Sequence, residues 1–108
     1  MLQQSEIKRK LIRIEHEIDE VVKSCKADDK LPQKLKECVT EWKQQTDKVM
    51  SGFDSNDSKQ IVESVNELEQ IGHRAEMALQ EAPGADEKMC DTLMHAQSEL
   101  FKLKKKLH

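Results

Sequence analysis

The sequence is poor in aromatic residues and in the residues that make turns. Among its 108 residues only Trp42, Phe53 and Phe101 are aromatic, and tyrosine is absent. This scarcity argues against modules that bind nucleic acids by stacking bases on aromatic rings. The chain also has only three glycines and two prolines, whereas a β-rich fold of this length needs many more turns. These deficits favour a helical fold with few loops.

Long apolar runs are missing as well. No stretch of about 18 apolar residues is present, so the sequence predicts no transmembrane segment. The first ten residues are polar and lack the apolar centre of a signal peptide. We therefore expect a cytoplasmic protein.

Charged residues are abundant, at 36% of the chain, and they equal the hydrophobic share. Low hydrophobicity combined with a high net charge is typical of disordered chains. Here the two signs nearly cancel, because the net charge is only -3. The composition therefore indicates a folded helical protein whose few apolar residues are concentrated in stripes.

Apolar residues recur at alternating steps of three and four in four segments of the chain. This spacing places the members of each stripe on one face of a helix. It predicts helices at approximately residues 4–27, 32–51, 57–82 and 86–107. The stripes are Ile7, Leu11, Ile14, Ile18, Val21 and Cys25; Leu35, Cys38, Val39, Trp42, Thr46, Val49 and Phe53; Ile61, Val65, Leu68, Gly72, Ala75, Leu79 and Ala82; and Met89, Leu93, Ala96, Leu100, Leu103 and Leu107.

Residues with known end preferences bound these helices. Pro32 suits the first turn of the second helix, where its missing N–H costs nothing, and Gly52 suits its end. Asp57 with Gln60 three residues later predicts a capping box. Asp86 is the expected N-cap of the fourth helix.

Short connections make consecutive helices antiparallel neighbours. We therefore predict an all-α fold, a single-domain antiparallel up-down-up-down four-helix bundle over residues 1–108, with a loop over residues 51–57. The alternative is a long helical hairpin that pairs with a second copy. The break at Pro83-Gly84 and the similar helix lengths favour the closed monomer.

This topology places all three cysteines, Cys25, Cys38 and Cys90, in the half of the bundle that holds the first and third loops. Three thiolates suit a soft metal, and two suit a disulfide. The favoured interpretation is a role as small buried apolar residues, because Cys25 and Cys38 lie on apolar stripes. No pair has the Cys-x-x-Cys spacing of redox and zinc motifs.

Basic residues gather near both ends of the chain, which the topology brings to one end of the bundle. This basic pole consists of Lys8, Arg9, Lys10, Arg13, Lys102, Lys104, Lys105 and Lys106. Lysines at a helix C-terminus complement the helix dipole, but bases at the start of the first helix oppose it. A basic pole attracts an acidic partner, nucleic acid or anionic lipid. The acidic net charge and the lack of aromatics disfavour nucleic acid.

Some apolar residues lie off the core stripes. Cys90, Met94 and Phe101 form a second stripe on the last helix, roughly 100–140° from the first at about 100° per residue. Ile12 and Met77 also lie off their stripes. Isolated exposed apolar residues are ordinary, but a row of them is typical of a docking surface. We take Ile12, Met94 and Phe101 as the candidate partner surface.

Patterns that carry catalysis are absent. None of the four histidines has a glutamate three residues before it, as a di-iron bundle requires. Phosphate-binding glycine loops, nucleophile motifs and calcium loops are also missing. We therefore expect no catalytic residues, no cofactor and no bound metal.

The sequence favours a non-catalytic helical interaction protein: an adaptor, a chaperone-like bundle or a regulatory subunit. It would act by helix-face docking onto another protein or onto a second copy of itself. Two alternatives remain: a thiol- or metal-dependent function of the three cysteines, and binding of nucleic acid or an anionic membrane by the basic pole.

Overall fold

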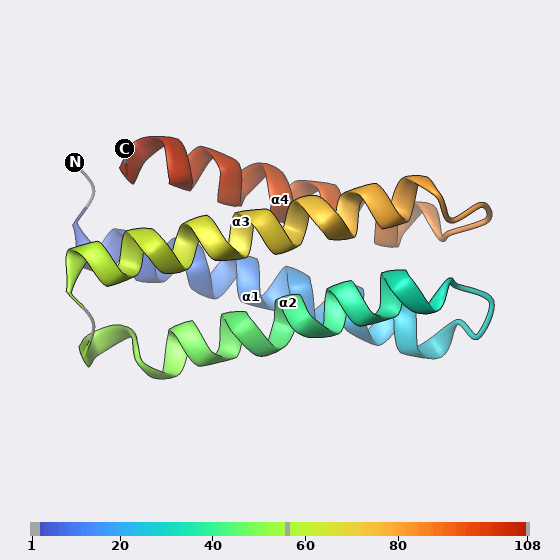
Figure 1. The fold of residues 1–108 in the computed structure, drawn as a ribbon, viewed down its shortest axis with the longest axis horizontal. Helices are drawn as coiled ribbons and strands as arrows, with labels where there is room; N and C mark the ends of the chain where they lie inside the picture. The colour runs from blue at the N-terminus through green and yellow to red at the C-terminus, as the bar shows by residue number, and fades with distance from the viewer. Residues whose placement is uncertain (1–2, 56, 108) are drawn as a thin grey trace.

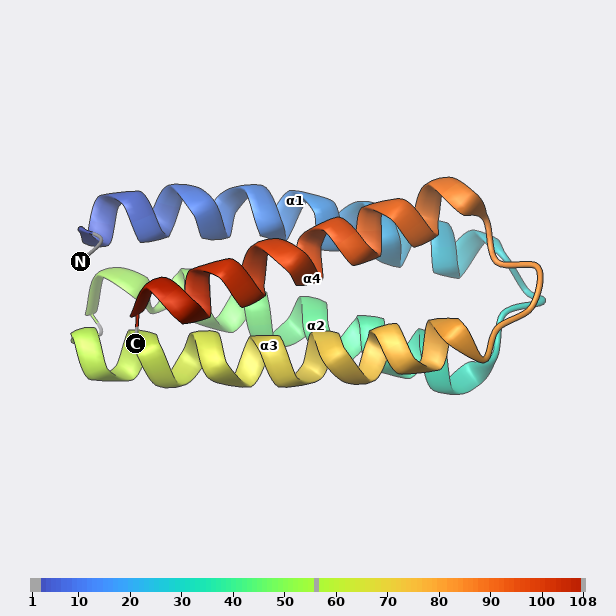
Figure 2. The ribbon, with the colours of Figure 1, turned by 90° about the horizontal axis from the view of Figure 1, so that it is seen from above.

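Residues 3–55 and 57–107 are described in a computed structural model of the chain. They form four α-helices, α1 (Gln4–Ala27), α2 (Gln33–Ser51), α3 (Ser58–Gln80) and α4 (Glu87–Leu107), and one short 3-10 helix, η1 (Phe53–Ser55). Consecutive helices run antiparallel (Figures 1 and 2), and α4 packs against α1 as well as α3. The predicted all-α, up-down-up-down four-helix bundle is confirmed.

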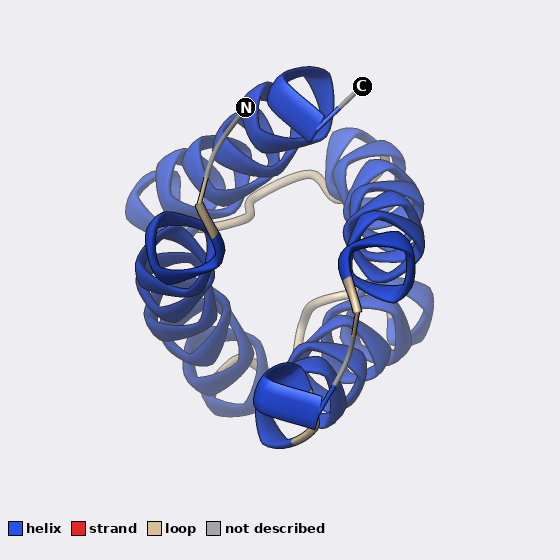
Figure 3. Cartoon of the chain, turned by 90° about the vertical axis from the view of Figure 1, so that its left-hand side faces the viewer, coloured by secondary structure: helices blue, strands red, loops and turns tan. Residues whose placement is uncertain are grey.

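The core is one continuous cluster that runs along the inside of the ring of helices seen end-on in Figure 3. Every predicted stripe residue of α1, α2 and α3 is buried, and on α4 only Leu107 remains partly exposed. The stripes are wider than a strict heptad. Additional residues close the seams between neighbouring helices, namely Val22, Leu31, Ile71, Ala78 and Gln97.

The predicted helix starts after the second and third connections are confirmed at atomic level. The Asp57 carboxylate accepts a 2.8 Å hydrogen bond from the Gln60 backbone N–H, and the Asp57 N–H donates at 3.0 Å to the Gln60 side chain. The Asp86 carboxylate accepts a 3.1 Å bond from the Met89 N–H. Each cap satisfies backbone donors that the first helical turn leaves unpaired.

Several predicted boundaries differ from the structure. The proline at position 32 is the N-cap of α2 rather than its first helical residue. Phe53 does not extend α2, because the chain leaves that helix at Ser51 and turns through η1, which still buries the Phe53 ring. Residues 51–57 are therefore not a plain loop, and residue 56 lies outside the described residues.

The third helix also ends earlier than predicted, at Gln80. The chain then turns through Pro83 and Gly84. Gly84 has a φ of 81°, a backbone angle that residues other than glycine rarely adopt. Ala82 nevertheless stays buried in the core cluster, and its N–H donates a 3.0 Å hydrogen bond to the Leu79 carbonyl.

The middle of the bundle holds a close contact among three helices. A Cβ atom on Gly72 of α3 would lie 1.9 Å from Oε1 of Gln97 and 2.8 Å from Cζ2 of Trp42. Gln97 is anchored there because its Nε2 donates a 3.1 Å hydrogen bond to the Glu69 carbonyl. Within the described residues, Oε1 of Gln97 and Nε1 of Trp42 have no hydrogen-bond partner. The absence of a side chain at position 72 therefore sets how closely α3 approaches α2 and α4.

We predict that Gly72→Ala destabilises the bundle by about 1–3 kcal/mol, as overpacking of a filled core does. Alanine has the higher helix propensity by about 1 kcal/mol, so a loss of stability would show that packing dominates. Urea unfolding followed by circular dichroism measures the change. Gln70→Ala, at an exposed position of the same helix, is the control and should be neutral or slightly stabilising. An unchanged midpoint for Gly72→Ala would mean that Gln97 and Trp42 move aside freely.

Candidate functional site

Four large apolar side chains stand exposed among the described residues. Their exposed fractions are 38% for Ile12, 49% for Met77, 50% for Met94 and 46% for Phe101. Three of them form the candidate partner surface taken from the sequence. The contacts of their neighbours show which of the four lie together.

Met94 and Phe101 lie on the same outer face of α4, on the side that leans toward α3. Gln97, between them in sequence, donates to the carbonyl of Glu69 on α3. Lys104, one turn beyond Phe101, reaches the Glu69 carboxylate at 3.4 Å. The two exposed side chains are two turns apart, roughly 10 Å along the axis. They therefore form one strip, whereas Cys90, the third residue of the predicted stripe, is partly buried and packs against the core.

Ile12 lies elsewhere. Lys8, one turn before it, pairs with Asp54 of η1 at 3.1 Å. Asp19, two turns after it, pairs with Lys43 of α2 at 2.7 Å. Residues at these spacings share a helix face, so Ile12 faces the α2 side of α1. The structure therefore does not bring Ile12 together with Met94 and Phe101.

Met77, the remaining exposed apolar side chain, is also separate from the α4 strip. It lines an open groove between α2 and α3 together with Cys38 and Arg74. Met77 thus offers a comparison residue of the same chemistry and exposure on a different face.

Both segments of the basic pole lie at the same end of the bundle, where the chain termini sit in Figure 1. Nδ1 of His95 on α4 is 2.5 Å from the Glu17 carboxylate on α1, which fixes the register of the two antiparallel helices. One helical turn from that pair toward the basic pole, Arg13 of α1 is level with Glu99 of α4. Lys10 is then level with Lys102.

Part of the basic pole is neutralised inside the molecule. Lys8 pairs with Asp54, Lys102 with Glu99 at 3.8 Å, and Lys104 with Glu69. The Lys105 ammonium stands 4.8 Å from the centre of the Phe101 ring.

A second part of the basic pole is unneutralised. Arg9, Lys10 and Arg13 make no ion pair with any residue in 3–55 or 57–107. Together with Glu6 they line an open surface groove of about 300 Å³. This part of the pole can meet an external anion without first breaking an internal pair.

The three cysteines are free thiols in the half of the bundle predicted from the sequence. Sγ of Cys25 lies 3.4 Å from Sδ of Met89, inside the core. Burial raises the pKa of Cys25 to about 11, and burial followed by the charges of Asp91 and Asp86 raises the pKa of Cys90. The thiolate is the reactive and metal-binding form, so both shifts disfavour thiol chemistry.

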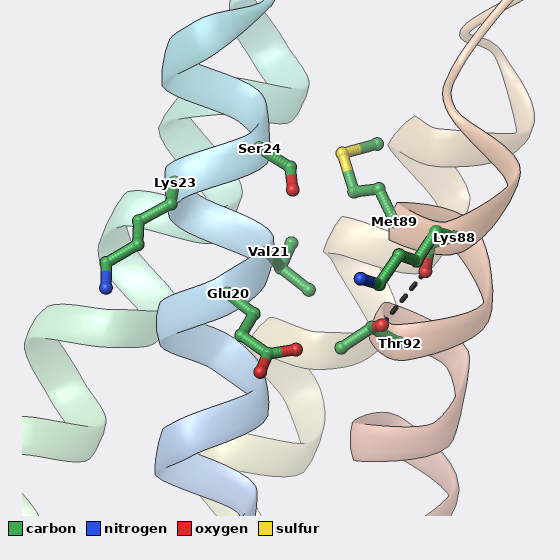
Figure 4. A pocket seen from close by; sticks show the side chains of 7 residues that line it. All are labelled: Glu20, Val21, Lys23, Ser24, Lys88, Met89 and Thr92. Atoms are coloured by element: carbon green, nitrogen blue, oxygen red, sulfur yellow. Dashed lines mark hydrogen bonds between the residues drawn. The ribbon is translucent and has the colours of Figure 1, made fainter.

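No metal site is visible in the described part of the chain: no group of three His, Cys, Asp or Glu residues there could hold an ion. A groove between α1 and α4 has a volume of about 310 Å³ and is lined by Ser24 and Met89, the sequence neighbours of Cys25 and Cys90 (Figure 4). Glu20 and Lys88 point into it from opposite helices, and the Thr92 hydroxyl is bonded to the Lys88 carbonyl at 2.9 Å. Among the described residues, the Ser24 hydroxyl that lines this groove makes no hydrogen bond to Glu20 or Lys88.

Comparisons with known proteins identify no relative. No protein-family model, curated protein or solved structure matches this chain. Across residues 3–55 and 57–107, none of the helices combines the length and the apolar character needed to cross a membrane.

The thiol geometry leads to a direct prediction. In the folded protein at pH 8, Cys90 should react first with a disulfide reagent, and Cys25 should react at least 100-fold more slowly than an unperturbed thiol, roughly the loss in thiolate expected from its raised pKa. Ellman's assay on the wild type and on Cys90→Ser measures this. The substitution should remove the fast phase, and guanidinium should make all remaining thiols react rapidly. Fast labelling of Cys25 in the folded state would contradict the assignment.

Proposed function

We propose that this chain is a non-catalytic interaction module that docks a protein partner on the outer face of α4, around Met94 and Phe101. The supporting observation is their half exposure in a bundle whose core stripes are otherwise almost fully buried. Burying apolar surface is favourable by about 25 cal/mol per Å². Burial of Met94 and Phe101 against a partner would therefore release free energy that the isolated bundle does not gain.

The spacing of the strip suits a helical partner. Met94 and Phe101 are seven residues apart, which places one apolar anchor on each of two consecutive heptads, the arrangement by which helices dock side by side. A half-exposed phenylalanine is a rigid anchor that gains much contact area for little loss of freedom. An adaptor, a chaperone-like bundle or a regulatory subunit acts through such a contact without chemistry.

The basic pole complements this docking surface. Lys102 and Lys105 follow Phe101 in sequence, and Arg9, Lys10 and Arg13, which make no ion pair with another described residue, lie at the same end of the bundle. Positive charge beside an apolar anchor steers acidic partners and raises the association rate more than the final affinity. We therefore expect the partner surface to be apolar with an acidic margin.

The docking proposal predicts that the double variant Met94→Glu, Phe101→Glu loses its partner. Charging two anchors should weaken binding by about 2 kcal/mol or more, roughly 30-fold. Affinity capture from the native cell with wild-type and variant baits, quantified by mass spectrometry, measures the loss. Met77→Glu is the matched control, since Met77 is equally exposed on another face. A partner retained equally by all three baits would exclude the α4 strip.

Polyanion binding is the second candidate, supported by Arg9, Lys10 and Arg13, for which residues 3–55 and 57–107 provide no ion-pair partner. Nucleic acid or anionic vesicles bound by this basic groove should show an affinity that falls steeply with salt. Arg9→Glu, Arg13→Glu should abolish such binding and leave the Met94- and Phe101-dependent capture largely intact. Fluorescence titration of labelled RNA and of phosphatidylserine vesicles in dilute buffer measures it. Absence of binding at low salt would eliminate this candidate.

A further inference from the structure

The outer face of α4 carries a second heptad pattern that extends beyond the two apolar residues. Six exposed positions follow steps of four, three, four, three and four, on the side of the helix opposite its core stripe. This α4 outer stripe consists of Glu87, Asp91, Met94, Ser98, Phe101 and Lys105. Such spacing is what a helix needs to keep one seam against a partner helix over its whole length.

The α4 outer stripe changes character along its length. Its first two positions are acidic, its middle is apolar or small, and its last position is basic. A surface whose two ends carry opposite charges and whose middle is apolar is complementary to itself when one copy is turned end over end. Two-fold self-complementarity of this kind defines the interface of the commonest protein dimers.

We propose that the outer stripe of α4 pairs with the same stripe of a second copy of this chain, antiparallel, about a two-fold axis level with Ala96. This inference rests on the proposed docking function of Met94 and Phe101, and it identifies a second copy of the chain as the partner that binds there. In this register Glu87 lies opposite Lys105 of the second copy. Met94 lies opposite Ser98, whose small side chain gives the methionine room at the centre.

The remaining pair in this register is also favourable. Asp91 lies opposite Phe101 of the second copy, and the Lys105 ammonium stands 4.8 Å from the centre of that ring in each chain. The Asp91 carboxylate therefore meets a cation beside the aromatic ring. The apolar parts of Met94 and Phe101 then face each other diagonally across the seam.

Other arrangements are less favourable. A parallel pair would set Glu87 against Glu87 and Lys105 against Lys105. An antiparallel pair shifted by one heptad in one direction leaves Glu87 and Asp91 without partners and sets Met94 against Lys105. The opposite shift leaves Phe101 exposed. Only the register about Ala96 pairs all six positions and joins opposite charges.

The interface is small, so the dimer is a weak one. A single pair of helices buries about 1,000 Å² at most, which is the size of weak and transient interfaces. One flanking contact is unfavourable, because Lys88 of one copy lies near Lys102 of the other. The Glu99 carboxylate, 3.8 Å from the Lys102 ammonium, offsets part of that repulsion.

Sedimentation equilibrium of the purified full chain tests the proposal at concentrations up to a millimolar. The wild type should show a monomer–dimer equilibrium, and Met94→Glu, Phe101→Glu should be monomeric with an unchanged helical circular dichroism spectrum. Met77→Glu should dimerise like the wild type. A wild type that stays monomeric throughout, or a Met77→Glu variant that loses the dimer, would overturn the proposal.

Charge reversal tests the antiparallel register. Glu87→Lys alone and Lys105→Glu alone each create two like-charged pairs and should weaken the dimer roughly ten-fold. A mixture of the two variants restores both pairs and should form a heterodimer tighter than either variant's homodimer, and the double variant should likewise pair with itself more tightly than either single variant. Failure of both the mixture and the double variant to recover would overturn the antiparallel arrangement.

The two proposals fail in different ways. A monomeric wild type that still captures another protein through Met94 and Phe101 overturns only self-association. If the wild type is dimeric and the Met94 and Phe101 substitutions do not change its capture of other proteins, self-pairing is supported. The α4 strip then binds a second copy of the chain and not another protein.

Discussion

The packing of Trp42 against Gly72 is the constraint on which the rest of the bundle depends. The chain has one tryptophan and only two other aromatic residues, and this indole is the largest side chain that the core buries completely. It fits between helices because position 72 has no side chain to displace it. The neighbouring Gln97 closes the same space from α4 and is bonded to the α3 backbone. Three of the helices are therefore positioned by one local fit near the centre of the molecule.

Much of the fold could be predicted from the sequence because one physical rule dominates it. A polar chain with sparse apolar residues can bury them only when they lie on one face of each helix. The alternating spacing of three and four between apolar residues identifies that face directly. Capping followed the same logic. Asp57, Gln60 and Asp86 were recognisable because their side chains satisfy backbone donors of the first turn, a local interaction that needs no knowledge of the tertiary structure.

Other features depend on angles between helices that spacing alone does not give. The pattern identified Ile12 as lying off its stripe, but it did not show that this side of α1 faces α2 rather than α4. Phe53 keeps the spacing of α2 although the backbone has already turned, because a 3-10 turn can bury a ring as well as a helix does. Gln97 is buried although it lies outside the predicted apolar stripe, and its only signal in the sequence is its place beside Ala96 of that stripe.

The candidate site was partly predictable for the same reason. Met94 and Phe101 share one helix, so their common face followed from sequence spacing. Which lysines of the basic pole remain unpaired did not, because Lys8 and Lys104 find acidic partners on η1 and α3 that are far from them in sequence. The distribution of free charge over a surface is a property of the tertiary structure, whereas the presence of charge is a property of the composition.

The contact between α1 and α4 has a consequence for how the chain folds. The other helix pairs join consecutive helices, which meet through short connections, whereas α1 and α4 meet only across nearly the whole sequence. Loop-closure entropy is small for hairpins and larger for that last contact. Helical bundles rich in local contacts fold in microseconds to milliseconds, and here two helical hairpins can form independently before the ring closes. The topology therefore favours the α1–α4 interface, which closes the longest loop, as the last of the helix contacts to form.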